Sequence, residues 1–163
     1  MKKILILSFL FLTLNISAIE VCGVPFVSSY QTTYNAVSSK WGKPYGMNYE
    51  EIVYMDKLYA GEYWDIIIFR FQGNGGSSNI FNSCLFGKQF NSLADAERFR
   101  DYLANELSKT YKVFGSRTDE RGIKSYLGGQ DPTNPKLSAW TLDIDRNRVR
   151  LIYGPFNYLN EKF

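Results

Sequence analysis

Hydrophobic and polar positions along the chain first predict a helix that begins near residue 29. Either Ser28 or Ser29 can cap its N-terminus, because a serine hydroxyl accepts a hydrogen bond from the first turn. The apolar positions of this helix recur at helical spacing. They are Tyr30, Tyr34, Val37 and Trp41. Gly42 and Pro44 then end the helix.

Three strands are predicted next, at residues 50–58, 63–71 and 80–87. The first two are joined near Ala60-Gly61, and the second is rich in β-branched and aromatic residues. Because the second strand is apolar at both parities, we expect it to be central, with both faces at least partly covered.

A second, longer helix is predicted after Ser92, with Asp95 at the capping-box position. Its apolar stripe consists of Leu93, Ala96, Phe99, Leu103, Leu107 and Tyr111. Three further strands are expected at residues 121–127, 137–144 and 148–153, with a loop at 128–135. The predicted fold class is therefore α+β, with two helices packed on an antiparallel sheet of about six strands and a possible αβββ duplication.

The first eighteen residues have the pattern of a secretory signal peptide. Lys2 and Lys3 precede an apolar run at residues 4–14 that is too short to span a bilayer, and Ser17-Ala18 follow as small residues before a cleavage site. We expect a signal peptide at 1–18 and a single domain at 19–163, exported to the periplasm or the medium and soluble rather than lipid-anchored. A bacterial lipid anchor needs small residues before its cysteine, whereas Cys22 follows Ile-Glu-Val.

Removal of the signal leaves seventeen basic and sixteen acidic residues. No cluster of Lys and Arg is present, so neither nucleic acid nor an anionic membrane is expected as the main partner. The two cysteines, Cys22 and Cys84, leave two alternatives open. They can form a disulfide in an oxidising compartment, or they can be buried free thiols.

The chain contains no histidine, which excludes Ser-His-Asp and Cys-His sites and the usual histidine-bearing metal sites. No cofactor or metal is predicted, and Asp143-x-Asp145-x-Asn147 is interpreted as a hairpin turn rather than a calcium loop. An enzyme would have to rely on carboxylates. A polysaccharide hydrolase would need Glu62 or Asp65 to face Asp143 or Asp145 across roughly 5 to 9.5 Å.

Aromatic residues are abundant, with twelve Tyr, twelve Phe and three Trp. Those near predicted turns are candidates for a surface that binds a protein or a glycan. The candidates are Tyr63, Trp64, Tyr59, Tyr45 and Tyr49. The alternative is that each ring covers a strand edge or a sheet face. Tyr63 and Trp64 have opposite parity, so at least one of them should face away from the core.

Two stretches carry a resemblance to exported bacterial proteins. Val24-Pro25-Phe26, the capped helix and Trp41-Gly42-Lys43-Pro44 resemble the opening of modules with the β-lactamase-inhibitor-protein-like fold, a group that includes the lipoprotein subunit of the outer-membrane assembly machine. Residues 59–65 and 69–72 are similar to small secreted bacterial proteins of comparable length. The first resemblance implies an exported α+β architecture, with binding of another protein as the typical activity.

The sequence thus predicts an exported, non-enzymatic binding or interaction module. Two alternatives are the carboxylate-dependent hydrolase and an inhibitor of a secreted enzyme, which would insert the loop at 128–135 into its partner.

Overall fold

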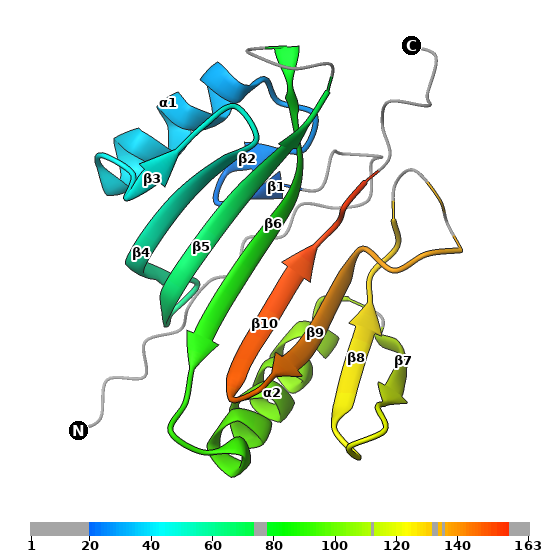
Figure 1. Cartoon of the computed structure of the whole chain (residues 1–163). Coiled ribbons are helices and arrows are strands. Elements are labelled where there is room, and N and C mark those ends of the chain that lie inside the picture. Colours follow the sequence, from blue (N-terminus) through cyan, green and yellow to red (C-terminus); the bar gives the residue numbers. More distant parts are fainter. Residues whose placement is uncertain (1–19, 74–77, 112, 132–133, 135, 157–163) are drawn as a thin grey trace, which may run out of the picture.

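The computed structural model describes residues 20–73, 78–111, 113–131, 134 and 136–156 (Figure 1). The predicted signal peptide at 1–18 therefore lies outside the described residues. The elements are β1 (Glu20–Val21), β2 (Val24–Pro25), α1 (Tyr30–Trp41), β3 (Gly46–Met47), β4 (Glu51–Tyr59), β5 (Glu62–Gln72), β6 (Ile80–Gln89), α2 (Leu93–Ser108), β7 (Val113–Thr118), β8 (Lys124–Gly128), β9 (Trp140–Asp145) and β10 (Arg148–Tyr153).

Both helices begin at a serine cap, as their sequences predict. The hydroxyl of Ser29 accepts from the backbone N–H of Thr32 at 3.1 Å, and that of Ser92 accepts from Asp95 at 3.1 Å. Gly42 ends α1 with φ of 78° and donates its N–H to the carbonyl of Ser38. These contacts satisfy backbone groups that have no partner inside the helix.

In the described part of the chain, eight strands form one antiparallel sheet in the order β3-β4-β5-β6-β10-β9-β8-β7, and β1 pairs with β2 in a separate ribbon. Each helix is followed by a four-stranded meander, and the two meanders join where their last strands, β6 and β10, pair (Figure 1). The α+β class is confirmed, but the expected number of about six strands is too small.

The missed strands are short or polar. β1, β2 and β3 have two residues each, and β7 is an edge strand that includes Gly115-Ser116-Arg117, which shows no alternation of apolar and polar positions. An edge strand needs pairing on one side only and tolerates such a sequence. The strand predicted at 121–127 begins later, because Asp119 accepts hydrogen bonds from the backbone of Arg121 and Ile123 and holds a turn there.

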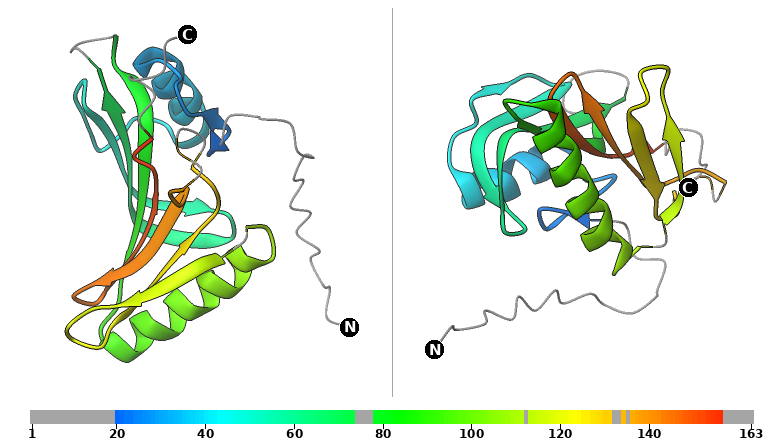
Figure 2. Two further views of the ribbon diagram at one scale, coloured as in Figure 1. Left: turned by 90° about the vertical axis from the view of Figure 1, so that its right-hand side faces the viewer. Right: turned by 90° about the horizontal axis from the view of Figure 1, so that it is seen from below.

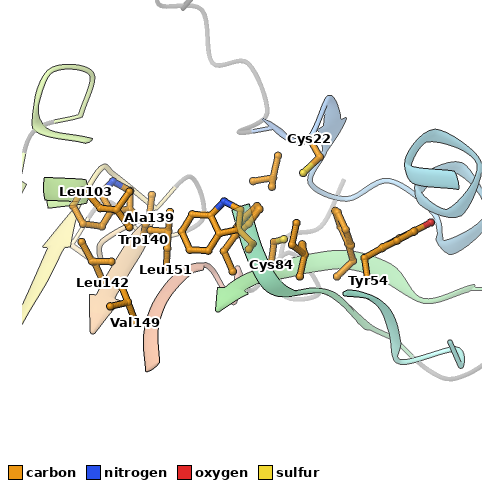
Figure 3. Close-up of a cluster of buried hydrophobic side chains, with 14 of the residues drawn as sticks. Cys22, Tyr54, Cys84, Leu103, Ala139, Trp140, Leu142, Val149 and Leu151 are labelled. Carbon is orange, nitrogen blue, oxygen red and sulfur yellow. The ribbon is translucent and has the colours of Figure 1, made fainter. Parts of the chain in front are cut away.

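Both helices and the β1–β2 ribbon lie on the same side of the sheet (Figure 2). Ring contacts agree with this arrangement: Trp41 of α1 contacts Phe69 and Phe99 of α2 contacts Trp64, both on β5. One cluster of buried hydrophobic side chains runs through both halves, from Tyr54 on β4 to Leu103 on α2 (Figure 3). No helix among the described residues has the length and apolar character needed to cross a lipid bilayer.

Candidate ligand-binding site

A cavity of about 550 Å3 opens on the helix side of the sheet, between β1, the β4–β5 hairpin and the C-terminal half of α2. Leu103, Leu107 and Leu151 form part of its wall. Six aromatic side chains make up much of the remainder. They are Tyr59, Trp64, Phe86, Tyr102, Tyr111 and Tyr153. A concave, mostly apolar space of this size falls within the range of sites that bind small organic molecules.

A local shift in the strand pattern turns Trp64 toward this cavity. Strict alternation from the buried Ile67 would place Trp64 on the opposite face of the sheet. Instead, Trp64 is 3% exposed, and its ring contacts Phe86 and Phe99 on the helix side. The left-handed backbone of Asp56, with φ of 54°, marks a matching irregularity in the neighbouring strand β4.

The hairpin that carries Tyr59 and Trp64 closes through a two-residue turn. Ala60 and Gly61 both have positive φ, 52° and 83°, as a type I′ turn requires. The indole N–H of Trp64 donates to the carbonyl of Tyr59 at 3.3 Å. The turn and this bond hold the two side chains on the same wall of the cavity.

Tyr59 connects the hairpin to the β1–β2 ribbon. Its ring stacks on Phe86 with 5.2 Å between ring centroids, and its hydroxyl accepts a hydrogen bond from the backbone N–H of Cys22 at 3.1 Å. Burial raises the pKa of Tyr59, and burial also raises the pKa of Tyr153 well above 10.0. Both phenols are therefore neutral and keep a proton that can be donated to a bound molecule.

Four charged residues line the cavity: Glu20 on β1, Glu62 on β5, Glu106 on α2 and Lys109, which follows α2. Glu106 pairs with Lys109 at 2.5 Å. Glu62 pairs with Lys88 at 3.0 Å, and Lys88 is not among the cavity-lining residues. The described lining thus combines an apolar aromatic wall with three carboxylates and one ammonium group.

The phenols of the cavity lie close enough to these carboxylates to be affected by them. Burial raises the pKa of Tyr102, and the charges of Glu62 and Glu106 add to the rise. Burial likewise raises the pKa of Tyr111, and the charge of Glu20 adds to it. A carboxylate that disfavours the phenolate form of a tyrosine also disfavours any other anion bound at the same place.

The five aromatic residues predicted as a binding surface do not come together. Tyr59 and Trp64 line the cavity, whereas Tyr63 points away from the core and is 64% exposed. Tyr45 and Tyr49 are exposed at the other end of β4, where the ring of Tyr49 lies against α1. The expectation that Tyr63 or Trp64 would face away from the core is met by Tyr63.

Both cysteines are buried free thiols in the structure. Cys22 lies in the turn between β1 and β2, and Cys84 lies on β6 with its side chain in the core (Figure 3). Burial raises the pKa of Cys22 to about 12 and that of Cys84 well above 9.0. Neutral, enclosed thiols of this kind behave as small hydrophobic groups.

The four carboxylates considered for a hydrolase do not face one another. Asp143 and Asp145 lie on β9 and both bind Arg150, at 2.7 and 3.3 Å. Glu62 and Asp65 belong to β5, and Asp65 accepts a hydrogen bond from the backbone of Gln89. Two strands, β6 and β10, separate β5 from β9, which sets the strand axes about 14 Å apart. This spacing exceeds the range that glycoside hydrolysis uses.

The face of the sheet without helices carries a second feature, a row of half-buried side chains that face one another across six neighbouring strands. From β4 to β8 the row is Val53, Ile68, Leu85, Ile152, Thr141 and Leu127. We call it the cross-strand row. Its members are apolar except for a threonine, and no tyrosine or tryptophan belongs to it.

Sequence reasoning missed most of the cavity. The apolar stripe predicted for the second helix includes Leu103, Leu107 and Tyr111, although α2 ends at Ser108 and Tyr111 lies beyond it. A stripe shows only that a helix is covered and not that a space remains beneath it. Tyr153 carries no local signal of a site at all. No protein-family model, curated protein or solved structure matches this chain.

Proposed function

We propose that this chain is an exported, non-enzymatic binding module that captures a small molecule in the cavity between the β4–β5 hairpin and α2. The observation that carries the proposal is the cavity itself, with a volume of about 550 Å3 and six aromatic side chains in its wall. Aromatic rings supply large apolar contact areas at a low cost in conformational entropy. The signal-like pattern of residues 1–18 supports export.

Binding is favoured over catalysis by the chemistry of the lining. The titratable groups of the wall are phenols, three carboxylates and one lysine, and the chain has no histidine to act as a base near neutral pH. Glu62 and Glu106 are each engaged in an ion pair. The resemblance of residues 24–44 to exported modules whose typical activity is binding also supports a binding role.

The test is to recover the protein in its exported form and ask what it carries. Native mass spectrometry of the purified protein, followed by solvent extraction of any bound molecule, compares wild type with Leu107→Trp. Leu107 lines the cavity, so a tryptophan there fills the space. Leu137→Trp is the matched control, because Leu137 is 55% exposed and lies outside the cavity.

We expect wild type and Leu137→Trp to retain a bound molecule and Leu107→Trp to lose it, with all three giving the same circular-dichroism spectrum. A bound molecule also raises the melting temperature, so its loss lowers the temperature for Leu107→Trp toward that of the stripped protein. Equal retention by the two tryptophan variants would show that the cavity is not the binding site.

A second candidate function is the binding of another protein, and the cross-strand row favours it. An apolar row on a sheet face without helices is a surface that a partner can cover. Ile68→Lys places a charge at the centre of this row without touching the cavity. Loss of a captured partner in this variant, with retention in Leu107→Trp, would assign the partner to the sheet face, and the opposite result would exclude that face.

A further inference from the structure

We propose that the ligand of the cavity is an organic cation, a molecule with an apolar body against the aromatic wall and a positively charged ammonium group beside the lining carboxylates. This inference rests on the proposed function, because it names the ligand class of the same cavity. It follows from the charges of the lining residues, from the effect of these charges on nearby tyrosines and from the electron-rich faces of the aromatic rings.

The charged groups that line the cavity are unbalanced. Three are carboxylates, on Glu20, Glu62 and Glu106, and one is the ammonium of Lys109. Glu106 is paired with Lys109, and Glu62 with Lys88 from outside the lining. Glu20 makes no ion pair with any residue that the structure describes. The described lining therefore holds more carboxylates than ammonium groups, so a bound cation reduces the imbalance whereas a bound anion adds to it.

The pKa values of two tyrosines in the cavity wall reflect the charges of the same carboxylates. After burial, the causes that raise the pKa of Tyr102 include Glu62 and Glu106, and the cause that raises the pKa of Tyr111 is Glu20. Tyr102 and Tyr111 thus place the influence of all three carboxylates on the cavity wall, and not only on the outer surface. Lys109 opposes them at Tyr102 but does not reverse the direction.

Aromatic walls add a preference for positive charge. The face of an aromatic ring is electron-rich and attracts ammonium groups within about 6 Å of its centroid. This protein already uses that interaction beside the cavity, where the ammonium of Lys40 lies 5.0 Å from the ring centroid of Tyr59. A quaternary or alkylated ammonium is weakly hydrated, so it loses little when it leaves water to contact such rings.

The alternative ligand classes gain less from this site. A fatty acid or another carboxylate would bring a fourth negative charge to the cavity and would gain nothing from the faces of the rings. A neutral amphiphile gains burial of its apolar part only. The expected order of affinity is therefore cation, then neutral molecule, then anion.

Three probes with the same chain test this order: octyltrimethylammonium, octyl glucoside and octyl sulfate, each below the concentration at which it forms micelles. Isothermal titration calorimetry measures their affinities for the mature protein at low and at high salt. Glu20→Gln removes the carboxylate that has no ion pair among the described residues. Glu120→Gln is the matched control, because Glu120 is exposed in the turn between β7 and β8.

We expect wild type to bind the ammonium about tenfold more tightly than the sulfate at low salt, with the difference shrinking as salt screens the carboxylates. Glu20→Gln should weaken the affinity for the ammonium probe about threefold or more and change the affinity for the glucoside by less than about twofold. Glu120→Gln should change neither affinity. Sulfate or glucoside binding as tight as ammonium binding, or equal effects of the two Gln variants, would overturn the inference.

The failure of this inference is distinguishable from the failure of the proposed function. If the glucoside or the sulfate binds best and Leu107→Trp abolishes that binding, the cavity is a binding site with a different ligand class. If no probe binds and exported wild type carries no molecule that Leu107→Trp loses, both proposals are wrong.

Discussion

Trp64→Ala should destabilise the protein severely, whereas Tyr63→Ala, one residue earlier on the same strand, should have little effect. Tyr63 is 64% exposed and Trp64 is 3% exposed. The indole contacts Phe86 at 5.2 Å and Phe99 at 6.0 Å between ring centroids, and its N–H is bonded to the carbonyl of Tyr59. The exposed fractions of these neighbouring side chains therefore differ by about 60 percentage points.

The magnitude follows from what the alanine removes. Truncating a buried tryptophan costs about 3 to 5 kcal/mol through lost apolar burial and the space left behind. Trp64 borders an existing cavity that can admit water, so we expect about 4 kcal/mol, the lost hydrogen bond included. Truncating the exposed Tyr63 to alanine should change the free energy of unfolding by less than about 0.5 kcal/mol.

Equilibrium urea unfolding at 25 °C, followed by circular dichroism, gives both values. In thermal unfolding, Trp64→Ala should lower the melting temperature by about 10 °C for a chain of this size. A cost below about 1 kcal/mol, or equal costs at the two positions, would refute the placement of Trp64 on the helix side of the sheet. For binding studies Trp64→Phe is the better variant, because it keeps a ring in the wall.

Four further predictions concern the turn, the core and the thiols. Ala60→Gly should stabilise the protein by about 1 kcal/mol in urea unfolding, because Ala60 has φ of 52° and glycine adopts positive φ without steric cost; a loss of stability would contradict the type I′ turn. Gly128→Ala should cost about 3 kcal/mol in the same assay, because a Cβ there would lie 2.2 Å from Cζ2 of the buried Trp140; an unchanged unfolding midpoint would show that the indole lies elsewhere. Burial raises the pKa of Cys22 from 9.0 to about 12, so only the unfolded thiol ionises between these pH values. The contribution of this thiol to the free energy of unfolding is fully present below pH 9 and should fall by about 1.4 kcal/mol per pH unit between pH 9 and about 12. An equally steep fall in a Cys22→Ala variant would contradict the assignment to Cys22. Labelling with a thiol reagent should reach Cys22 and Cys84 only in urea, and a disulfide would block labelling even there.

Local sequence signals determined much of the secondary structure. The serine caps and Gly42 act within one turn of backbone, so they could be recognised without knowledge of the fold. The β-branched and aromatic residues of β5 likewise favour an extended strand, and its apolar character at both parities indicated that both of its faces are covered. The α+β class and the order of the helices and longer strands followed from these patterns.

The tertiary structure decided which side chains meet. A break in the alternation of buried positions places both Trp64 and Ile67 on the helix side of the sheet, and no signal in the neighbouring sequence predicts it. The cavity joins β1, the hairpin, α2 and β10, which are far apart along the chain. Helical and strand periodicities record which face of an element is covered, whereas a binding site depends on the space left between elements. That space is set by the packing of the whole chain.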